Sequence, residues 1–306
     1  MSDIIPYQEI ALTVIFPKDD PASIDGPFLA LWLRGKSEKT VRAYRADIRR
    51  FYAIVGKPLQ QVTLQDVYTF VDATRNLAPA SRNRAVAAVK SALSFGAKSK
   101  YLPFNVGTMV KLEKLEDRLA ERIMSEQAIA RLLALETNKR NHAILVLLYR
   151  GGLRCAELCS LTWRNLQERD EAGQITVYGK GNKTRAVLLS QETWDEVMEV
   201  MTIPEKFPGY DEYVFQSRQA HSRTDKNNRR MDESTVFRIV QRAAERSGIS
   251  GNVSPHWMRH AHATHALENG APITLVKETL GHKSIETTAK YTHVRPNASS
   301  GQYLKV

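Results

Sequence analysis

Two β-rich runs stand close together in the second half of the chain, over residues 174–178 and 184–189. Residues 180–183, Lys-Gly-Asn-Lys, lie between them, and the central Gly-Asn suits the two-residue turn of a β-hairpin. The other patterned segments have apolar residues at the helical spacing of three and four. The sequence therefore predicts a mainly α fold that contains a small β-hairpin or sheet.

Helical signals begin near Gly26 and continue through the first third of the chain. Ser37 is a good N-cap for a helix that runs to about Val55, where Gly56 ends it. A further helix follows Thr63, and another begins after residues 79–81 and runs to about residue 97. Four short helices of this kind predict a compact, all-helical domain.

The length of 306 residues exceeds what one hydrophobic core usually serves, because domains commonly have roughly 100–200 residues. Pro103, Gly107 and alternating charges give residues 99–120 the composition of a linker. We expect a lead-in over 1–18, a helical domain over 19–104, a linker over 105–120 and a second domain over 121–306. Ser125 predicts the first helix of the second domain, and further helices are expected near 139–150, 191–201, 233–247, 256–269, 273–280 and 284–293.

Positive charge is in excess, with 44 lysines and arginines against 33 acidic residues and a net charge of +11. Such an excess favours a polyanionic partner, and nucleic acid is the commonest one. Basic residues recur along the first long helix and the last helix of the helical domain, although a charged run can also be a solvated face. The candidate DNA contacts are Arg42, Arg45, Arg49, Arg82, Arg84 and Lys90.

The sequence gives no sign of membrane insertion or export. No stretch approaches the roughly 18–20 consecutive apolar residues that span a bilayer, and residues 1–10 do not resemble a signal peptide. The two cysteines, Cys155 and Cys159, are four residues apart, with no second pair to complete a zinc site. We expect core thiols in a cytoplasmic protein.

Four of the eight histidines lie within residues 256–265, which invites a metal-site hypothesis. On a helix, His256, Arg259 and His260 share one face while His265 points the other way. Two imidazoles beside a cation, with no nearby carboxylate and no His-Glu-x-x-His spacing, argue against a metal. The pairing of His256 with Arg259 instead aims a proton-handling group and a fork of hydrogen-bond donors at one spot.

Arg154 and Tyr291 are further candidates. Two glycines before Arg154 allow a sharp turn, so its guanidinium can project from the start of a helix; the alternative is an ordinary surface pair with Glu157. Ser284 predicts a short helix that carries Tyr291 about two turns on. Taken alone, one tyrosine among eleven is far more often a packing residue than a nucleophile.

Five motifs occur in order along the chain: Gly-Leu-Arg-x-x-Glu-Leu, Gly-Lys-Gly-Asn-Lys-x-Arg, His-x-x-Arg-His, Leu-Gly-His and Tyr-Thr-His. This set resembles the tyrosine recombinases, also called the phage integrase family, over nearly all of residues 26–293. The resemblance implies a helical core-binding domain followed by a mixed, mostly helical catalytic domain. It implies catalytic positions at Arg154, Lys180, His256, Arg259, His282 and Tyr291, with Glu157 in support. His262 departs from the pattern, because many members have an aromatic residue there.

By this resemblance the chain cuts and rejoins DNA without a cofactor. Tyr291 attacks a phosphate to leave a 3′-phosphotyrosine and a free 5′-hydroxyl, while Arg154 and Arg259 stabilise the developing charge. Lys180, preferred to Lys183 on the family pattern, protonates the leaving 5′-oxygen. His256 is expected to be the base or proton relay, and His282 to hydrogen-bond the phosphate.

The implied partner is double-stranded DNA with a specific recombination site. A homotetramer would assemble on two such sites from monomers or weak oligomers and work through a Holliday junction. The alternatives are a type IB topoisomerase, a DNA-binding protein without catalysis and, least favoured, a metal-dependent nuclease. The sequence leaves open the target site, the choice among integration, excision, resolution and inversion, the need for a directionality factor or partner recombinase, and the exchange of C-terminal segments between protomers.

Overall fold

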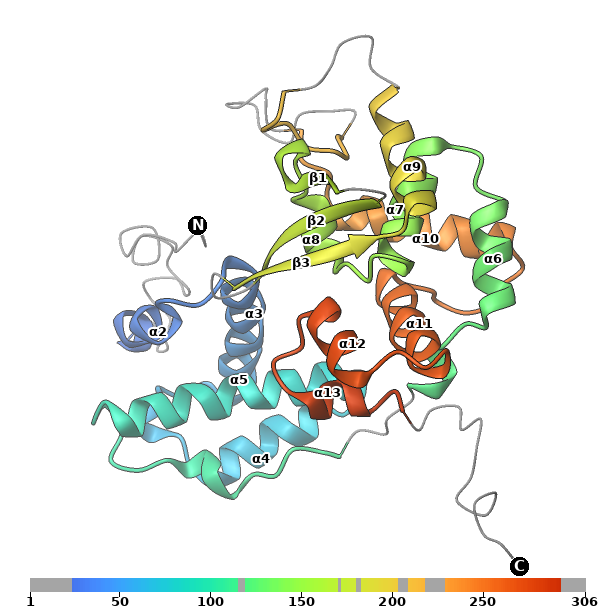
Figure 1. Ribbon diagram of the computed structural model, residues 1–306. Coiled ribbons are helices and arrows are strands. Elements are labelled where there is room, and N and C mark those ends of the chain that lie inside the picture. The colour runs from blue at the N-terminus through green and yellow to red at the C-terminus, as the bar shows by residue number, and fades with distance from the viewer. Residues whose placement is uncertain are drawn as a thin grey trace, which may run out of the picture. The chain divides into compact units, whose positions relative to one another are not determined.

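The computed structural model describes residues 24–114, 119–169, 172–179, 183–202, 209–217 and 229–292. Two compact units make up the chain, Met1–Glu116 and Asp117–Val306. Helices dominate the described part of both units, and the three described strands lie in the second (Figure 1). The predicted fold class, mainly α with a small β-sheet, is confirmed. Within the described ranges, no helix is long and apolar enough to cross a membrane.

Local capping sets the helices of the first unit. The Ser37 side chain caps α3, and Gly56 ends this helix in the left-handed conformation, with φ of 65°. Thr63 and Asp66 form a reciprocal capping box at the start of α4. The helix α5 begins at Pro79 itself, because proline fits the first turn of a helix. The described helices of this unit are α2 (Gly26–Leu33), α3 (Glu38–Val55), η2 (Leu59–Gln61), α4 (Leu64–Ala73), α5 (Pro79–Lys98) and η3 (Val106–Met109).

The core of the first unit lies where α3 packs against α4 and α5. Phe51 of α3 and Phe70 of α4 meet edge to face, with ring centroids 5.2 Å apart. On α5 the buried side chains include Ala85, Ala88 and Ala92, whose small size lets this helix approach α3 closely. The apolar side chains that α3 buries are Val41, Ile48, Phe51 and Tyr52.

Asp25 is a fully buried carboxylate that links separate segments of this unit. It accepts hydrogen bonds from the Tyr52 hydroxyl at 2.6 Å, from the Leu59 backbone N–H at 2.7 Å and from the Tyr101 hydroxyl at 2.6 Å. These donors belong to α3, to η2 and to the segment that follows α5. Three donors satisfy the carboxylate away from water and hold the segments together.

Residues 105–113, expected as linker, pack on the helical unit instead. Val110 is buried in its core, and the Lys90 ammonium donates a hydrogen bond to the Val110 carbonyl. Arg82 forms an ion pair with Glu113. The charges that suggested a linker therefore include partners of α5, which a composition argument cannot distinguish from solvated charges.

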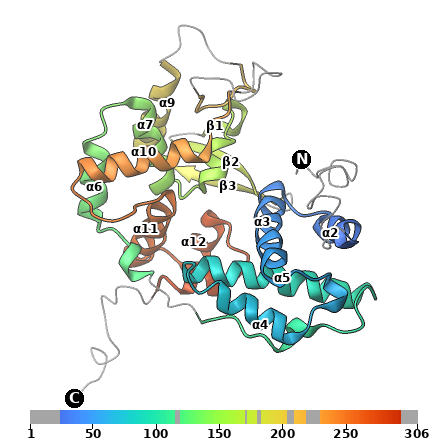
Figure 2. The same ribbon diagram turned by 180° about the vertical axis from the view of Figure 1, so that it is seen from behind.

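Helices in the second unit surround one antiparallel sheet. Figure 2 shows α10 lying beside α6 and α7. The predicted helices near 139–150, 233–247, 256–269 and 273–280 are all present, with small shifts of their ends. The described elements are η4 (Ala120–Arg122), α6 (Glu126–Ala134), α7 (Lys139–Tyr149), α8 (Cys155–Cys159), η5 (Trp163–Asn165), β1 (Leu166–Arg169), β2 (Ala172–Gly179), β3 (Lys183–Leu189), α9 (Gln191–Met198), η6 (Glu199–Thr202), α10 (Glu233–Arg246), α11 (Pro255–Glu268), α12 (Ile273–Leu280) and α13 (Ile285–Ala289).

The sheet has the order β1-β2-β3. β2 and β3 pair with Ile175 opposite Val187, and both side chains are buried on the core face. Gly173 gives the Trp194 ring of α9 room against the sheet, because a Cβ at this position would lie 1.9 Å from the ring. The hairpin prediction is confirmed for the two strands, whereas residues 180–182 of the turn lie outside the described residues.

The second unit has α7 at the centre of its core. Residues 143–148 of this helix are all buried, and α7 packs against α9 and α11. A helix buried on all sides reads as a continuous apolar run without a polar face. The position of α7 matters for function because its C-terminal end leads directly into the Gly151-Gly152 turn.

Candidate active site

The turn between α7 and α8 places Arg154. Gly152 has φ of +57°, a conformation that favours glycine, and a Cβ there would come within 2.9 Å of the Leu280 side chain, which would have to shift. Arg154 then occupies the N-cap position of α8, and its Nη2 donates a hydrogen bond to the Gly281 carbonyl at 3.1 Å. The guanidinium is thereby held against the Leu-Gly-His segment at the end of α12.

Glu157 joins Arg154 to Arg185, a residue that the sequence analysis did not assign. Its carboxylate accepts hydrogen bonds from the Arg154 backbone N–H, from Arg154 Nη1 and from both terminal nitrogens of Arg185, each at 2.8 Å. Burial alone would raise the pKa of Glu157, but the hydrogen bonds from Arg185 and Arg154 outweigh it and lower the pKa to about 2. Arg185 also donates to the Thr279 carbonyl at 2.7 Å, which ties β3 to α12.

Arg259 of α11 approaches the same place from the interior. It is buried, and its two terminal nitrogens donate hydrogen bonds to the carbonyls of Gly152 and Leu280. Burial, followed by the nearby Arg154 charge, lowers the pKa of Arg259 to about 9, so the guanidinium stays protonated at neutral pH. Backbone carbonyls thus fix two guanidiniums side by side, and anions are what such a pair binds.

Two histidines of the predicted set flank these arginines. His282 hydrogen-bonds through Nδ1 to the Thr288 hydroxyl at 2.9 Å, and burial together with Arg259, Arg154 and Arg185 lowers the pKa of His282 to about 4. His256 lies in the first turn of α11 with an exposed side chain. Partial shielding of the ring, then the charges of Arg259 and Arg154, lower the pKa of His256 as well. At neutral pH both imidazoles are neutral.

Tyr291 lies in a turn beyond α13, so the prediction that a helix carries it is wrong. The helix ends at Ala289, and the Tyr291 backbone N–H bonds to the Thr288 carbonyl at 3.0 Å. The ring is buried against Val276 and Leu280, with only 8% of its surface exposed. Its hydroxyl is 2.7 Å from Nδ1 of His260.

Five of the six predicted catalytic residues therefore converge in the second unit: Arg154, His256, Arg259, His282 and Tyr291. Lys180, the sixth, lies outside the described residues, and nothing is described of the side chain of its competitor Lys183. Sequence reasoning missed Arg185 and His260. Both had a signal, because Arg185 closes the second motif and His260 shares a helix face with His256.

The histidine segment divides as the helical geometry predicts. His265 is buried on the opposite side of α11, where Nδ1 is 2.9 Å from the Tyr149 hydroxyl. His262 hydrogen-bonds to the Tyr149 carbonyl at 2.7 Å. Among the described residues, no group of three His, Cys, Asp or Glu side chains is arranged to hold a metal ion.

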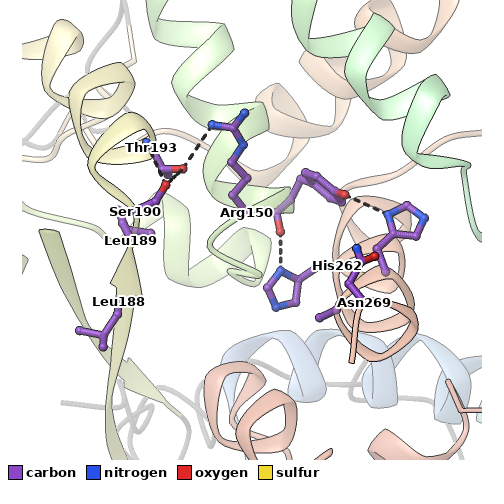
Figure 3. A pocket seen from close by; sticks show the side chains of 10 residues that line it. Arg150, Leu188, Leu189, Ser190, Thr193, His262 and Asn269 are labelled. Atoms are coloured by element: carbon purple, nitrogen blue, oxygen red, sulfur yellow. Dashed lines mark hydrogen bonds between the residues drawn. The ribbon is translucent and has the colours of Figure 1, made fainter. Parts of the chain in front are cut away.

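A pocket of about 350 Å³ opens beside His262, between the ends of α7 and β3, the start of α9 and α11 (Figure 3). Arg150 on one wall is engaged by Thr193 and by the carboxylates of Glu192 and Glu196. His262 also stands close to Gly152, since a Cβ on that glycine would lie 3.1 Å from its ring. This pocket therefore adjoins the back of the turn that positions Arg154.

The basic candidates of the first unit have different partners. Asp47, buried on α3, holds the Arg84 guanidinium of α5 at 2.8 Å, while Arg45 is half-buried. Arg82 and Lys90 brace residues 105–113, as described above. The candidates with exposed side chains are Arg42, Arg49 and Arg84.

Comparisons with known proteins agree with this arrangement. The model of the phage integrase family matches residues 120–298, and the model of the phage integrase N-terminal SAM-like domain matches residues 28–100. Tyrosine recombinase XerD of Shewanella oneidensis is 32% identical over 279 residues, which cover 86% of this chain and 89% of the relative. Tyrosine recombinase XerC of Myxococcus xanthus is 32% identical over 275 residues, covering 85% and 89%.

Solved structures share the fold. XerH site-specific recombinase bound to its difH substrate superposes with a TM-score of 0.70 at 17% identity, covering 97% of this chain and 90% of that one. A lambda integrase tetramer bound to a Holliday junction has a TM-score of 0.63 at 19% identity, covering 84% and 77%.

The chain belongs to the phage integrase family of tyrosine recombinases. It is accordingly a site-specific DNA recombinase, which cleaves and rejoins DNA strands through a phosphotyrosine intermediate and a Holliday junction. The family expected from the five motifs is confirmed.

Proposed function

We propose that Tyr291 is the nucleophile of this recombinase and that Arg154 and Arg259 bind the phosphate it attacks. The observation that carries the proposal is the fixation of both guanidiniums on carbonyls of two turns, at Gly152 and at 280–281, next to the segment that holds Tyr291. Preorganised donors of this kind stabilise a transition state because they need no rearrangement as charge develops.

The reaction is an exchange of esters. The Tyr291 oxygen bonds to phosphorus, the bond to the 5′-oxygen breaks, and the strand ends become a 3′-phosphotyrosine and a 5′-hydroxyl. Lys180 gives the proton to the departing 5′-oxygen, and His282 and His256, neutral at working pH, hydrogen-bond the phosphate. A 5′-hydroxyl from the partner strand then reverses the steps, so the exchange needs neither a cofactor nor a nucleotide.

The two units divide the work. We assign core-site binding to residues 19–113, connection to 114–120 and catalysis to 121–306; the linker expected over 105–120 is shortened because residues 105–113 pack on the helical unit. Arg42, Arg45, Arg49 and Arg84 contact DNA phosphates, while Arg82 and Lys90 support that surface from within the unit. Phosphate contacts make binding weaken steeply as salt concentration rises.

Four copies of the chain act together on two recombination sites. The likeness to a lambda integrase tetramer on a Holliday junction supports this assembly, since strand exchange between two duplexes has four cleavage positions. Free in solution, the chain is a monomer or a weak oligomer. We place the enzyme in the cytoplasm, where its DNA substrate is accessible.

Replacing the Tyr291 hydroxyl tests the nucleophile. Tyr291→Phe should bind a nicked suicide substrate as the parent does but form no covalent adduct, as seen by denaturing gel electrophoresis. Tyr210→Phe, at an exposed tyrosine of the same unit, is the matched control and should form adduct at the parental rate. An adduct in the Tyr291→Phe reaction would overturn the assignment. Chelators should leave the parental rate unchanged.

A further inference from the structure

His260 is the side chain whose ring nitrogen meets the Tyr291 hydroxyl. The distance from Nδ1 to the phenolic oxygen is 2.7 Å, within the range of a strong hydrogen bond, and the two ring centroids are 5.6 Å apart. His256, which the sequence analysis expected to be the base, lies one helical turn earlier. Its ring stacks on His260 with centroids 5.4 Å apart.

We propose that His260 takes the proton of Tyr291 during cleavage and returns it during resealing. The proposal rests on the proposed function, in which Tyr291 is the nucleophile. A phenol with an ordinary pKa near 10 keeps its proton at neutral pH, so attack on phosphorus needs an acceptor at hydrogen-bond distance. In the part of the chain that the structure describes, the ring nitrogen seen at that distance from the hydroxyl is Nδ1 of His260.

The two neighbouring histidines, His282 and His256, interact with other groups. Nδ1 of His282 is bonded to the Thr288 hydroxyl, and the His282 ring lies nearly parallel to the Tyr291 ring with centroids 6.4 Å apart. His256 is exposed and feels the charges of Arg259 and Arg154, which are the phosphate ligands. The distance to the hydroxyl therefore assigns His260, and not His256, to the phenol.

The step balances as a proton exchange with ester transfer. While the Tyr291 oxygen bonds to phosphorus, its proton moves to Nδ1 of His260, and the 5′-oxygen leaves with a proton from the acid at Lys180. In resealing, a 5′-hydroxyl oxygen attacks phosphorus and gives its proton to Lys180. The bond from phosphorus to Tyr291 breaks, and Nδ1 of His260 returns the proton to the phenolic oxygen. No oxidant, metal or further reactant enters.

The fold fixes His260 for this role. It lies on α11 directly after Arg259, whose guanidinium is bonded to the Gly152 and Leu280 carbonyls, so the helix cannot rotate without breaking those bonds. Tyr291 is fixed from the other side by its packing on Val276 and Leu280. The hydrogen bond therefore joins two side chains that other contacts already hold in place.

A spectroscopic experiment tests the hydrogen bond without any catalysis. The full chain is labelled with ¹³C at the tyrosine Cζ, and the Tyr291 signal is the one that Tyr291→Phe removes. We expect His260→Asn to shift this signal, and His142→Asn, at a partly buried histidine of the same unit, to leave it in place. An unshifted signal in His260→Asn would refute the contact, whatever Tyr291 does in the reaction.

A kinetic experiment then separates the nucleophile side from the leaving-group side. Suicide DNA is made with either oxygen or sulfur at the 5′ position of the scissile phosphate. A thiol ionises near pH 8.5, so the sulfur leaves without a proton and a defect in the general acid disappears. His260→Asn should slow single-turnover cleavage by about 10²–10⁴-fold on both substrates, whereas Lys180→Ala should recover on the sulfur substrate.

The outcomes distinguish the two proposals. A His260→Asn rate within threefold of the parent, or recovery on the sulfur substrate, would overturn the role of His260 while leaving Tyr291 as the nucleophile. Adduct formation by Tyr291→Phe would overturn the proposed function itself, and the ¹³C signal would still decide the hydrogen bond. Thermal melting checks that His260→Asn is folded, and His260→Gln replaces it in both experiments if it is not.

Discussion

Two of the buried carboxylates, Asp25 in the first unit and Glu157 in the second, have opposite kinds of partner. Asp25 in the first unit is held by two tyrosine hydroxyls and a backbone N–H, all of them neutral. Glu157 in the second unit is held mainly by the guanidiniums of Arg154 and Arg185. Asp25 uses neutral donors to hold three chain segments together. Glu157 instead fixes the positions of the two guanidiniums that donate to it.

This difference separates a structural carboxylate from a functional one. A buried ion pair returns little net stability, because the desolvation of both charges offsets their attraction. Glu157 is therefore poorly explained as a stabilising device and well explained as the residue that orients Arg154. Asp25 needs no such explanation, since hydrogen bonds to a buried carboxylate stabilise the fold directly.

The largest effect is expected from Glu157→Gln. Loss of the charge frees Arg154 from its position, so single-turnover cleavage at saturating protein should fall about 10²–10³-fold, as for removal of one preorganised donor. Arg185, which is largely buried, and Arg154, which is more than a third exposed, also lose their counter-charge, so the free energy of unfolding should fall by up to about 3 kcal/mol.

A matched control for this variant is Glu136→Gln. Glu136 is another buried carboxylate of the second unit. It is paired with Arg246, whereas Glu157 is paired with Arg154 and Arg185. It should lose stability in urea unfolding but cleave bound DNA at the parental rate. Equal rate losses in the two variants would contradict the orienting role of Glu157.

Asp25→Asn should have the next largest effect, and on stability alone. The amide cannot accept all three hydrogen bonds, so the free energy of unfolding should fall by about 1.5–3 kcal/mol. Cleavage of DNA that is already bound should stay within threefold of the parental rate. A tenfold slower single turnover at saturating protein would show that Asp25 is not a purely structural carboxylate.

The smallest expected effect is on the stability of the fold at acidic pH. Burial first, and the Arg259 charge after it, lower the pKa of His262 to about 4 in the folded chain, against 6.5 for the ordinary imidazole. Below pH 6.5 the unfolded chain therefore binds a proton that the folded chain does not, and stability falls as the pH falls towards 4. Each pH unit in this window costs at most about 1.4 kcal/mol.

The variant His262→Phe removes this difference in proton binding between the folded and the unfolded chain. Urea unfolding of the full chain should lose about 1–2 kcal/mol less between pH 6.5 and 4.5 in this variant than in the parent. Between pH 7 and 8 the two proteins should show the same pH dependence, since the imidazole is neutral in both states there. Parallel curves throughout would mean that His262 keeps an ordinary pKa when folded.

Most of the fold follows from local signals. Ser37, Thr63 and Ser125 begin helices where the sequence predicts them, because a capping hydroxyl acts within its own turn. The strand β1 was missed, since its residues have no alternation of their own and become a strand by pairing with β2. Val110 was missed as a core residue because its burial depends on helices distant in the sequence.

The site follows the same rule. The family resemblance of the five motifs named Arg154, Arg259 and Tyr291, which the structure brings close to one another. The partners of these residues were harder to predict: the contact between His260 and Tyr291 spans 31 positions, and that between Arg185 and Glu157 spans 28. Periodicity along one helix carries no information about which side chain a distant turn will meet.

The carboxylate of Glu157 has a consequence for how such enzymes diverge. One side chain serves two arginines, and one of them also holds the carbonyl of residue 279, so the three positions constrain one another. A mutation at 157 alone leaves two cations without a counter-charge, and a mutation at 185 alone leaves the carboxylate with half its donors. Substitutions at 157 and 185 should therefore be inherited as a pair, and lineages that change one should be found to have changed the other.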